Sequence, residues 1–128
     1  MTSYGFPDLV NLPQVIRNPL VAKERLNPAE WTYERLVKQI VKFEAKLSAD
    51  EELGGRFVTA PKDGAIHIAD IGYWNPDMLI FYGTDSDGRS IELLQHHSQL
   101  SLLLCAIPKE KEKPRRIGFI LEERLKGG

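Results

Sequence analysis

A run of short apolar segments separated by turn residues, over residues 66–121, sets the strongest limit on how this chain folds. The segments recur about every eight to twelve residues, a spacing typical of antiparallel strands. The two clearest segments are residues 78–82 and 90–94, and they flank Asp85-Ser86-Asp87-Gly88. An Asp-Gly pair supplies the positive φ that a hairpin turn requires. The pattern therefore predicts an antiparallel β-sheet in the second half of the chain.

A long helix is predicted before the sheet. Asn27 is a favourable N-cap, Pro28 suits the first helical position, and Glu30 stands at the capping-box position. Apolar residues then recur at helical spacing, and they are Tyr33, Leu36, Val37, Ile40, Phe43 and Leu47. Gly54-Gly55 ends this pattern, because glycine is common just past a helix. We expect one long N-terminal amphipathic helix over residues 27–53.

The flanking segments have weaker patterns. Residues 1–26 contain prolines without a sustained period, which predicts an extended arm. Residues 98–107 match either a short helix or a buried strand, since periodicity does not separate the two over so short a length. We favour a possible short second helix there. Residues 116–121 predict a last strand, and residues 122–128 a frayed tail.

The fold class that follows is α+β. We expect a single domain over residues 1–128, consisting of an arm (1–26), the long helix (27–53) and a β-rich core (56–121). The core should be an antiparallel β-sheet of about five to six strands. The helix is longer than a small sheet is wide, so we also expect a homodimer or higher homo-oligomer.

Composition excludes several classes of protein. The chain has 17 Lys and Arg against 18 Asp and Glu, for a formal net charge of −1, which does not favour binding to a DNA or RNA duplex. The single Cys105 cannot form an internal disulfide, which suits a reducing cytoplasm. No apolar stretch approaches the roughly 20 residues needed to cross a bilayer. We expect a soluble cytoplasmic domain without a membrane partner.

Metal-binding and catalytic patterns are weak in this sequence. His96 and His97, with His67 as a third ligand, suggest a metal site, but adjacent side chains on a strand point to opposite faces. Asp85-x-Asp87-Gly88 lacks the further oxygen ligands of a calcium loop. Ser98 beside His97 has no nucleophile-elbow context. We therefore predict no metal, no cofactor, no catalytic residue and no enzymatic activity.

Aromatic and arginine residues are the more suggestive feature. Aromatic faces stack on bases, and arginine holds phosphate in a bidentate fork. The residues we predict to bind a ligand are Trp74, Phe81, Tyr82, Arg89, Arg115 and Arg116. Taken singly, each is better explained as a core aromatic or a solvated arginine, and only the set favours a nucleotide-like anionic ligand. Because neighbours on a strand alternate, one of Phe81 and Tyr82, and one of Arg115 and Arg116, should face the ligand.

Four segments carry a family resemblance: Ile71-Gly72-Tyr73-Trp74, Leu79-Ile80-Phe81-Tyr82-Gly83, Ser98-Gln99-Leu100 and Pro114-Arg115-Arg116-Ile117-Gly118-Phe119. They resemble a small bacterial and phage family of unknown-function domains, and through it the phage Thoeris anti-defence sponge proteins. The resemblance implies an oligomer that binds cyclic ADP-ribose isomers, or cyclic oligonucleotides, without cleaving them. It implies ligand contacts from Phe81 and from Arg115 or Arg116. The arm and residues 109–113 have no counterpart in it.

The function expected on this basis is sequestration of a cyclic nucleotide immune signal by a phage anti-defence protein in the host bacterial cytoplasm. The alternative is a non-enzymatic protein-interaction or structural accessory module that uses the exposed helix as its contact surface. A nuclease or nucleotide hydrolase is the third reading, and the sequence supports it least.

Overall fold

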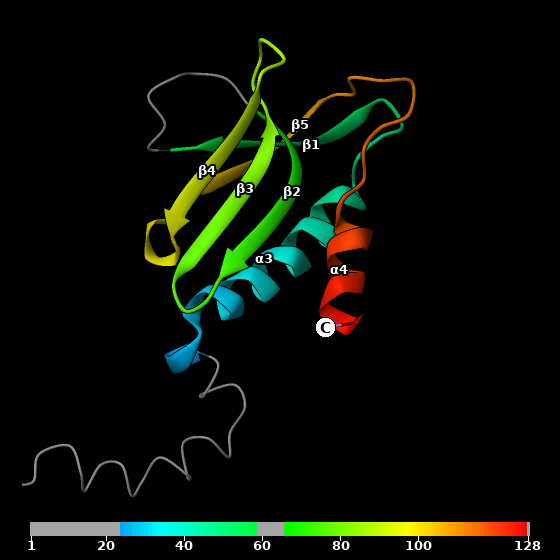
Figure 1. Cartoon of the computed structure of the whole chain (residues 1–128). Coiled ribbons are helices and arrows are strands. Elements are labelled where there is room, and N and C mark those ends of the chain that lie inside the picture. The colour runs from blue at the N-terminus through cyan, green and yellow to red at the C-terminus, as the bar shows by residue number, and fades with distance from the viewer. Residues whose placement is uncertain (1–23, 59–65, 128) are drawn as a thin grey trace, which may run out of the picture.

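The computed structural model describes residues 24–58 and 66–127. A strongly curled sheet wraps partly around two helices, α3 and α4 (Figure 1). The elements in chain order are α3 (Pro28–Glu44), β1 (Glu51–Phe57), β2 (Ile66–Trp74), β3 (Met78–Thr84), β4 (Ser90–His96), the short 3₁₀ helix η1 (His97–Gln99), β5 (Leu102–Pro108) and α4 (Gly118–Gly127). None of the helices within this part of the chain is long and apolar enough to cross a membrane.

The sheet contains five strands in the order β4-β3-β2-β1-β5, and all neighbours are antiparallel. This confirms the predicted α+β class and the antiparallel sheet. Strand β1 pairs with β5 along its whole length, but with β2 only at Gly54↔His67 and Gly55↔Ile66. Strands β1 and β5 therefore turn away from β2, β3 and β4 and bend the sheet (Figure 1).

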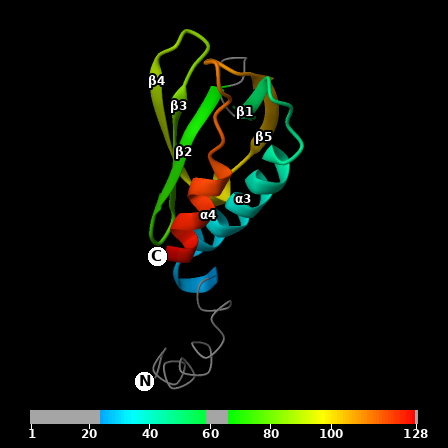
Figure 2. The same ribbon diagram turned by 90° about the vertical axis from the view of Figure 1, so that its right-hand side faces the viewer.

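The hydrophobic core lies between one face of the sheet and the two helices. Figure 2 shows both helices on the same side of β2, β3 and β4. The largest fully buried side chains are Val37, Ile40, Ile68, Ile71, Leu79, Phe81 and Leu121. Edge-to-face packing of Phe57 on Phe81, with ring centroids 4.9 Å apart, joins β1 to β3.

The predicted long helix is wrong at its C-terminal end. Helix α3 ends at Glu44, and Glu51 already begins β1. Gly54 and Gly55 lie inside that strand, paired with Cys105 and Leu104 of β5, instead of ending a helix. A Cβ at Gly54 would lie 2.6 Å from Ile107 Cδ1, so the close packing there requires a glycine. Backbone pairing with β5 thus outweighs the helical pattern that precedes the glycines. With the helix shorter and its stripe buried, its length no longer argues for an oligomer.

Two further predictions, for residues 98–107 and 116–121, are also wrong. Residues Leu102–Pro108 form strand β5 rather than a short second helix, because β1 offers a complete row of backbone partners. Ile117 precedes a helix, Gly118–Gly127, where a strand and a frayed tail were expected. Ile117 and Leu121 are both buried, and their spacing of four residues matches one helical turn. The predicted arm lies almost entirely outside the described residues.

Candidate functional site

A row of polar side chains crosses the sheet on the face opposite the helices. His67 pairs with Gly54 on β1 and with Thr84 on β3, and Thr84 pairs with Ser90 on β4. Directly opposed residues of antiparallel strands share one face. Since the neighbour of His67, Ile68, is buried in the core, this row points away from the helices.

A surface hollow of about 490 Å³ lies beside this row. Tyr82 lines it from β3, two residues before Thr84, and Glu92 lines it from the opposed position on β4. Arg115 lines it from the segment between β5 and α4. The hollow is therefore bordered by an aromatic ring, hydroxyl groups, a carboxylate and a guanidinium, a set that fits a polar ligand with a flat ring.

Arg115 is held at its backbone while its side chain keeps bonding capacity. Its N–H donates to Glu52 Oε1 at 3.0 Å. Its Nη2 lies 3.9 Å from Glu110 Oε1, and its buried Nη1 has no hydrogen-bond partner among the described residues. Thr84 Oγ1, on the same hollow, is likewise buried without a partner there. A buried donor without an acceptor is unfavourable, and an oxyanion would satisfy it.

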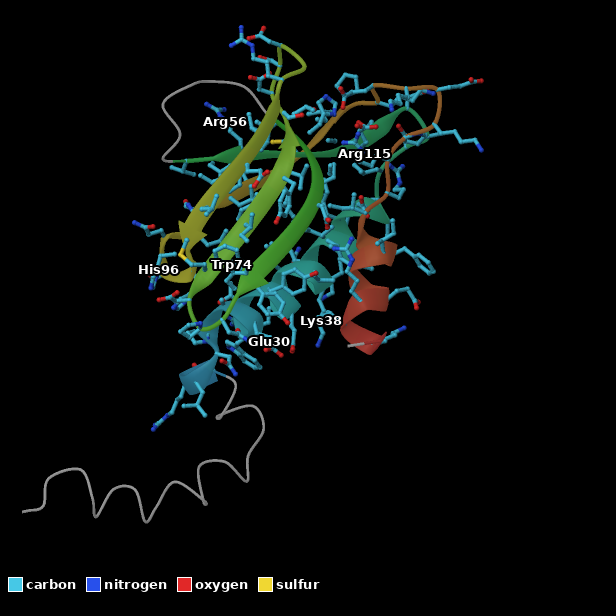
Figure 3. The ribbon with its side chains drawn as sticks, viewed as in Figure 1. Glu30, Lys38, Arg56, Trp74, His96 and Arg115 are labelled. Carbon is cyan, nitrogen blue, oxygen red and sulfur yellow. The ribbon has the colours of Figure 1, made fainter. Side chains whose placement is uncertain are left out.

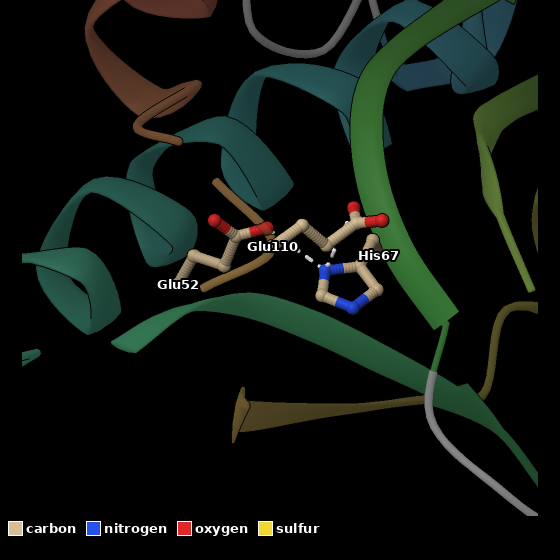
Figure 4. A group of neighbouring side chains, drawn as sticks. All are labelled: Glu52, His67 and Glu110. Atoms are coloured by element: carbon tan, nitrogen blue, oxygen red, sulfur yellow. Dashed lines mark hydrogen bonds and ion pairs between the residues drawn. The ribbon is translucent and has the colours of Figure 1, made fainter. Parts of the chain in front are cut away.

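The side chains of Glu52, His67 and Glu110 converge on one another (Figure 4). His67 Nδ1 lies 2.8 Å from Glu52 Oε2 and 3.2 Å from Glu110 Oε1. Burial of Glu52 raises the pKa of its carboxyl, but the bonds from the Arg115 N–H and from His67 outweigh burial and hold that pKa below its ordinary value. Glu52 is thus a buried carboxylate at neutral pH.

Arg116 and Phe81 have structural roles instead of the predicted ligand contacts. The Arg116 guanidinium donates to the backbone oxygens of Glu51 at 2.7 Å and Ser48 at 2.9 Å, and so closes the turn between α3 and β1. Phe81 is 1% exposed and packs in the core. Phe81 and Tyr82 alternate as predicted, with Phe81 in the core and Tyr82 at the hollow. Arg115 and Arg116 lie in the irregular segment between β5 and α4, where strand alternation does not apply, and of the two it is Arg115 that lines the hollow.

Trp74 and Arg89 lie away from the hollow. Trp74 is at the far end of β2 from Arg115, as Figure 3 shows, and is 65% exposed. Arg89 is exposed beside the hairpin turn, where its backbone N–H donates to Asp85 Oδ1. Of the six predicted ligand residues, only Tyr82 and Arg115 line the same hollow.

The histidine pair at the end of β4 forms a local cap. His96 Nδ1 lies 2.7 Å from Ser98 Oγ and accepts the Ser98 backbone N–H at 3.2 Å, which caps η1. Asp77 Oδ2 is 3.8 Å from His96 Nε2, longer than a hydrogen bond. The order Asp77, His96, Ser98 therefore has the composition of a hydrolase triad without its geometry.

A second hollow, of about 560 Å³, lies between α3, β2 and α4. Tyr33, Tyr73 and Arg124 line it. Its arginine is already paired, because Arg124 donates to both oxygens of Asp70 at 2.7 and 3.2 Å. The hollow beside Arg115 is the better anion site for this reason.

Comparison with known proteins places these residues in a family. The model of a family of unknown function, DUF6173, matches residues 23–120. The chain belongs to DUF6173. The match begins before α3 and ends inside α4, so the DUF6173 region includes the whole row on the sheet, the hollow and Arg115. No curated protein and no solved structure matches this chain.

The sequence analysis did not identify several of the residues at the hollow and in the neighbouring cluster. Glu52, Thr84 and Glu110 were not predicted, and His67 was considered only as a partner of His96 and His97. Glu52 and His67 are 15 residues apart, and Glu52 and Arg115 are 63 apart. The weak signal was strand register. The β-rich core was predicted to begin at residue 56, and had it been extended back to Glu51, the pairing of Gly54 with His67 would have placed Glu52 nearby.

Proposed function

We propose that this protein binds a small phosphate-bearing nucleotide in the hollow beside Tyr82 and Arg115 and holds it without converting it. The observation that carries the proposal is the Arg115 guanidinium, which lines the hollow with one buried nitrogen unpartnered among the described residues. The Arg115 side chain as a whole is 34% exposed, so a ligand can contact the guanidinium, and pairing with the buried Nη1 requires the side chain to turn toward the ligand.

The chemistry of the wall suggests how such a ligand would lie. Arg115 would hold a phosphate or pyrophosphate through charge-assisted hydrogen bonds. Tyr82 offers a ring face on which a base can stack. The hydroxyl of Ser90 and the carboxylate of Glu92 would bind sugar hydroxyls, because a carboxylate accepts hydrogen bonds from hydroxyl groups and repels phosphate.

The resemblance to Thoeris sponge proteins makes a cyclic ADP-ribose isomer the first ligand to test. A rigid cyclic nucleotide loses little conformational entropy when it enters a preformed hollow. Sequestration in the bacterial cytoplasm, as a phage anti-defence activity, follows if such a signal is bound tightly and recovered intact.

The direct test is calorimetric titration with a cyclic ADP-ribose isomer, followed by denaturation and analysis of the released material. Arg115→Ala should weaken binding roughly ten- to a hundredfold, since a hydrogen bond to a charged group contributes about 1.5–3 kcal/mol. Arg89→Ala, an exposed arginine outside the hollow, is the matched control and should bind like the parent. Equal binding by both variants would remove the anion site, and a cleaved product would indicate an enzyme.

An interaction function is the second candidate, because apolar side chains are exposed on the face of the sheet opposite the helices, here called the open face. Trp74 is 65% exposed and Leu94 52% exposed. The pairings Trp74↔Met78 and Ile80↔Leu94 place all four side chains on this face. Two copies of an uncharged apolar patch can meet across a two-fold axis without opposing like charges, which favours a second copy as the partner.

Light scattering tests the interaction function, because it measures whether the protein is a monomer or a dimer in solution. A dimer through the open face should dissociate in Trp74→Glu, while Phe119→Glu, which changes an exposed aromatic on α4, should leave the mass unchanged. A monomeric parent at micromolar concentration would contradict the expected homo-oligomer.

A further inference from the structure

We infer that Glu52, His67 and Glu110 form a binding site for a divalent first-row transition-metal ion such as Zn²⁺ (Figure 4). The site stands on its own geometry, and it is tested with metal alone. It therefore does not depend on the nucleotide proposed for the neighbouring hollow.

The donor atoms already lie near the separations that an ion requires. His67 Nδ1 is 2.8 Å from Glu52 Oε2 and 3.2 Å from Glu110 Oε1, and one ligand atom from each residue lies within 4.8 Å of the others. Zinc binds nitrogen and oxygen at about 2.0–2.2 Å in a tetrahedral arrangement, which separates the donors by roughly 3.4 Å. Small side-chain movements would close these three groups around an ion.

The proton and charge count also favours a cation. A neutral imidazole carries at most one proton on Nδ1, yet this nitrogen faces two carboxylates. Arg115 Nη2 lies 3.9 Å from Glu110 Oε1, beyond hydrogen-bond length. A dication bound by Nδ1 and both carboxylates would balance the two negative charges directly.

The surroundings hold the ligands in position. The Glu52 side chain is 3% exposed, and its second oxygen, Oε1, accepts the Arg115 N–H at 3.0 Å. Hydrogen bonds of this kind to a ligating carboxylate orient it toward the metal. Glu52 and His67 come from neighbouring strands, while Glu110 reaches them from the segment after β5. Three protein ligands leave a coordination position open to water or to a further ligand.

The types of donor atom limit which metal ion the site would bind. One imidazole with two carboxylates suits Zn²⁺, Mn²⁺ or Co²⁺ better than Ca²⁺ or Mg²⁺, which prefer oxygen alone. The site also differs from the three-histidine hypothesis, because His96 lies at the far end of the sheet from Arg115 (Figure 3).

The test is calorimetric titration of chelator-treated protein with Zn²⁺, with Co²⁺ absorption as a second readout. We expect one Zn²⁺ per chain, and ligand-field bands from bound Co²⁺ that change in His67→Gln. Glu110→Gln should weaken Zn²⁺ binding at least about tenfold, because it removes a direct ligand. Glu112→Gln, the same charge change at an exposed position of the same segment, is the matched control and should bind like the parent.

Glu110→Gln is preferred to a change at Glu52, because Glu52 is buried and accepts the Arg115 N–H, so its loss could unfold the chain. His96→Asn shows whether Zn²⁺ binds at the His96 imidazole instead of at the cluster, because the variant removes that imidazole. Absence of Zn²⁺ binding by the parent, equal binding by the Glu110 and Glu112 variants, or loss of binding in His96→Asn would each overturn the inference. The cluster would then be a hydrogen-bonded network of His67 with two carboxylates.

Discussion

The carboxylate of Glu44, the last residue of α3, caps the start of α4 at Gly118. Its Oε1 accepts the Gly118 N–H at 2.7 Å, and its Oε2 accepts the Ile117 N–H at 3.0 Å. A carboxylate at a helix N-terminus satisfies free N–H groups and interacts favourably with the helix dipole. One buried side chain thereby joins the two helices.

Glu44→Ala should destabilise the fold by about 2–4 kcal/mol, because it leaves two buried N–H groups without acceptors. Glu44→Gln should cost less, since its amide oxygen still accepts one of them. Urea denaturation measures both, with Glu123→Ala on exposed α4 surface as the control. Equal stability of the Glu44 and Glu123 variants would show that the cap contributes nothing.

Phe81 and Tyr82 should respond oppositely to truncation. Phe81→Ala removes a buried ring and should cost about 3–5 kcal/mol of stability. Tyr82→Ala changes a half-buried side chain at the hollow and should mainly weaken ligand binding. Thermal unfolding and titration of the same samples separate the two effects. If both variants lose stability alike and neither loses affinity, Tyr82 has no ligand role.

Arg116→Ala should lower stability and leave ligand affinity intact. Its guanidinium holds the backbone oxygens of Ser48 and Glu51, so the loss should be about 1–3 kcal/mol. Arg115→Ala should do the reverse, lowering affinity with little change in melting temperature. If the Arg115 variant instead loses stability and the Arg116 variant loses affinity, then Arg116 binds the ligand and Arg115 supports the fold.

Tyr33 should make the protein sensitive to alkaline pH. Burial raises the pKa of the Tyr33 phenol above its ordinary value of 10.0, the charge of Asp70 adds to this, and Arg124 opposes it. The neutral phenol is therefore favoured by folding. Its contribution is complete below about pH 10, where the unfolded phenol ionises, and is lost as pH rises toward the folded pKa.

Tyr33→Phe removes this ionisation. The free energy of unfolding of the variant should therefore fall less between pH 9 and 11 than that of the parent. Denaturant unfolding at several pH values measures the difference, and every other ionisable group is common to both proteins. Parallel curves for parent and variant would exclude Tyr33 as the source.

Local features were predictable where a few neighbouring residues decide the geometry. The hairpin turn is one: Gly88 has φ of 80°, and Asp85 Oδ1 accepts the N–H groups of Asp87 and Arg89. The start of α3 at Pro28 is another. Strand geometry also predicted that Phe81 and Tyr82 face opposite sides of the sheet, while the fold decided that Phe81 is the buried one.

Tertiary structure decided the elements whose backbone partners are distant. Helical spacing predicted helix up to residue 53, but pairing with β5 makes Glu51–Phe57 a strand. Gly118 begins a helix because Glu44, 74 residues away, accepts its N–H. Such contacts depend on which segments meet, and short-range periodicity contains no information about that.

The chain by itself determined the apolar strands, the hairpin and the start of α3, but it left open which of Phe81 and Tyr82 faces the core. Only the folded sheet brought Glu52, His67, Glu110 and Arg115 together, because β1, β2 and the segment after β5 supply them from distant positions. Charged side chains carry no periodic signal, so their convergence is set by strand order and register alone.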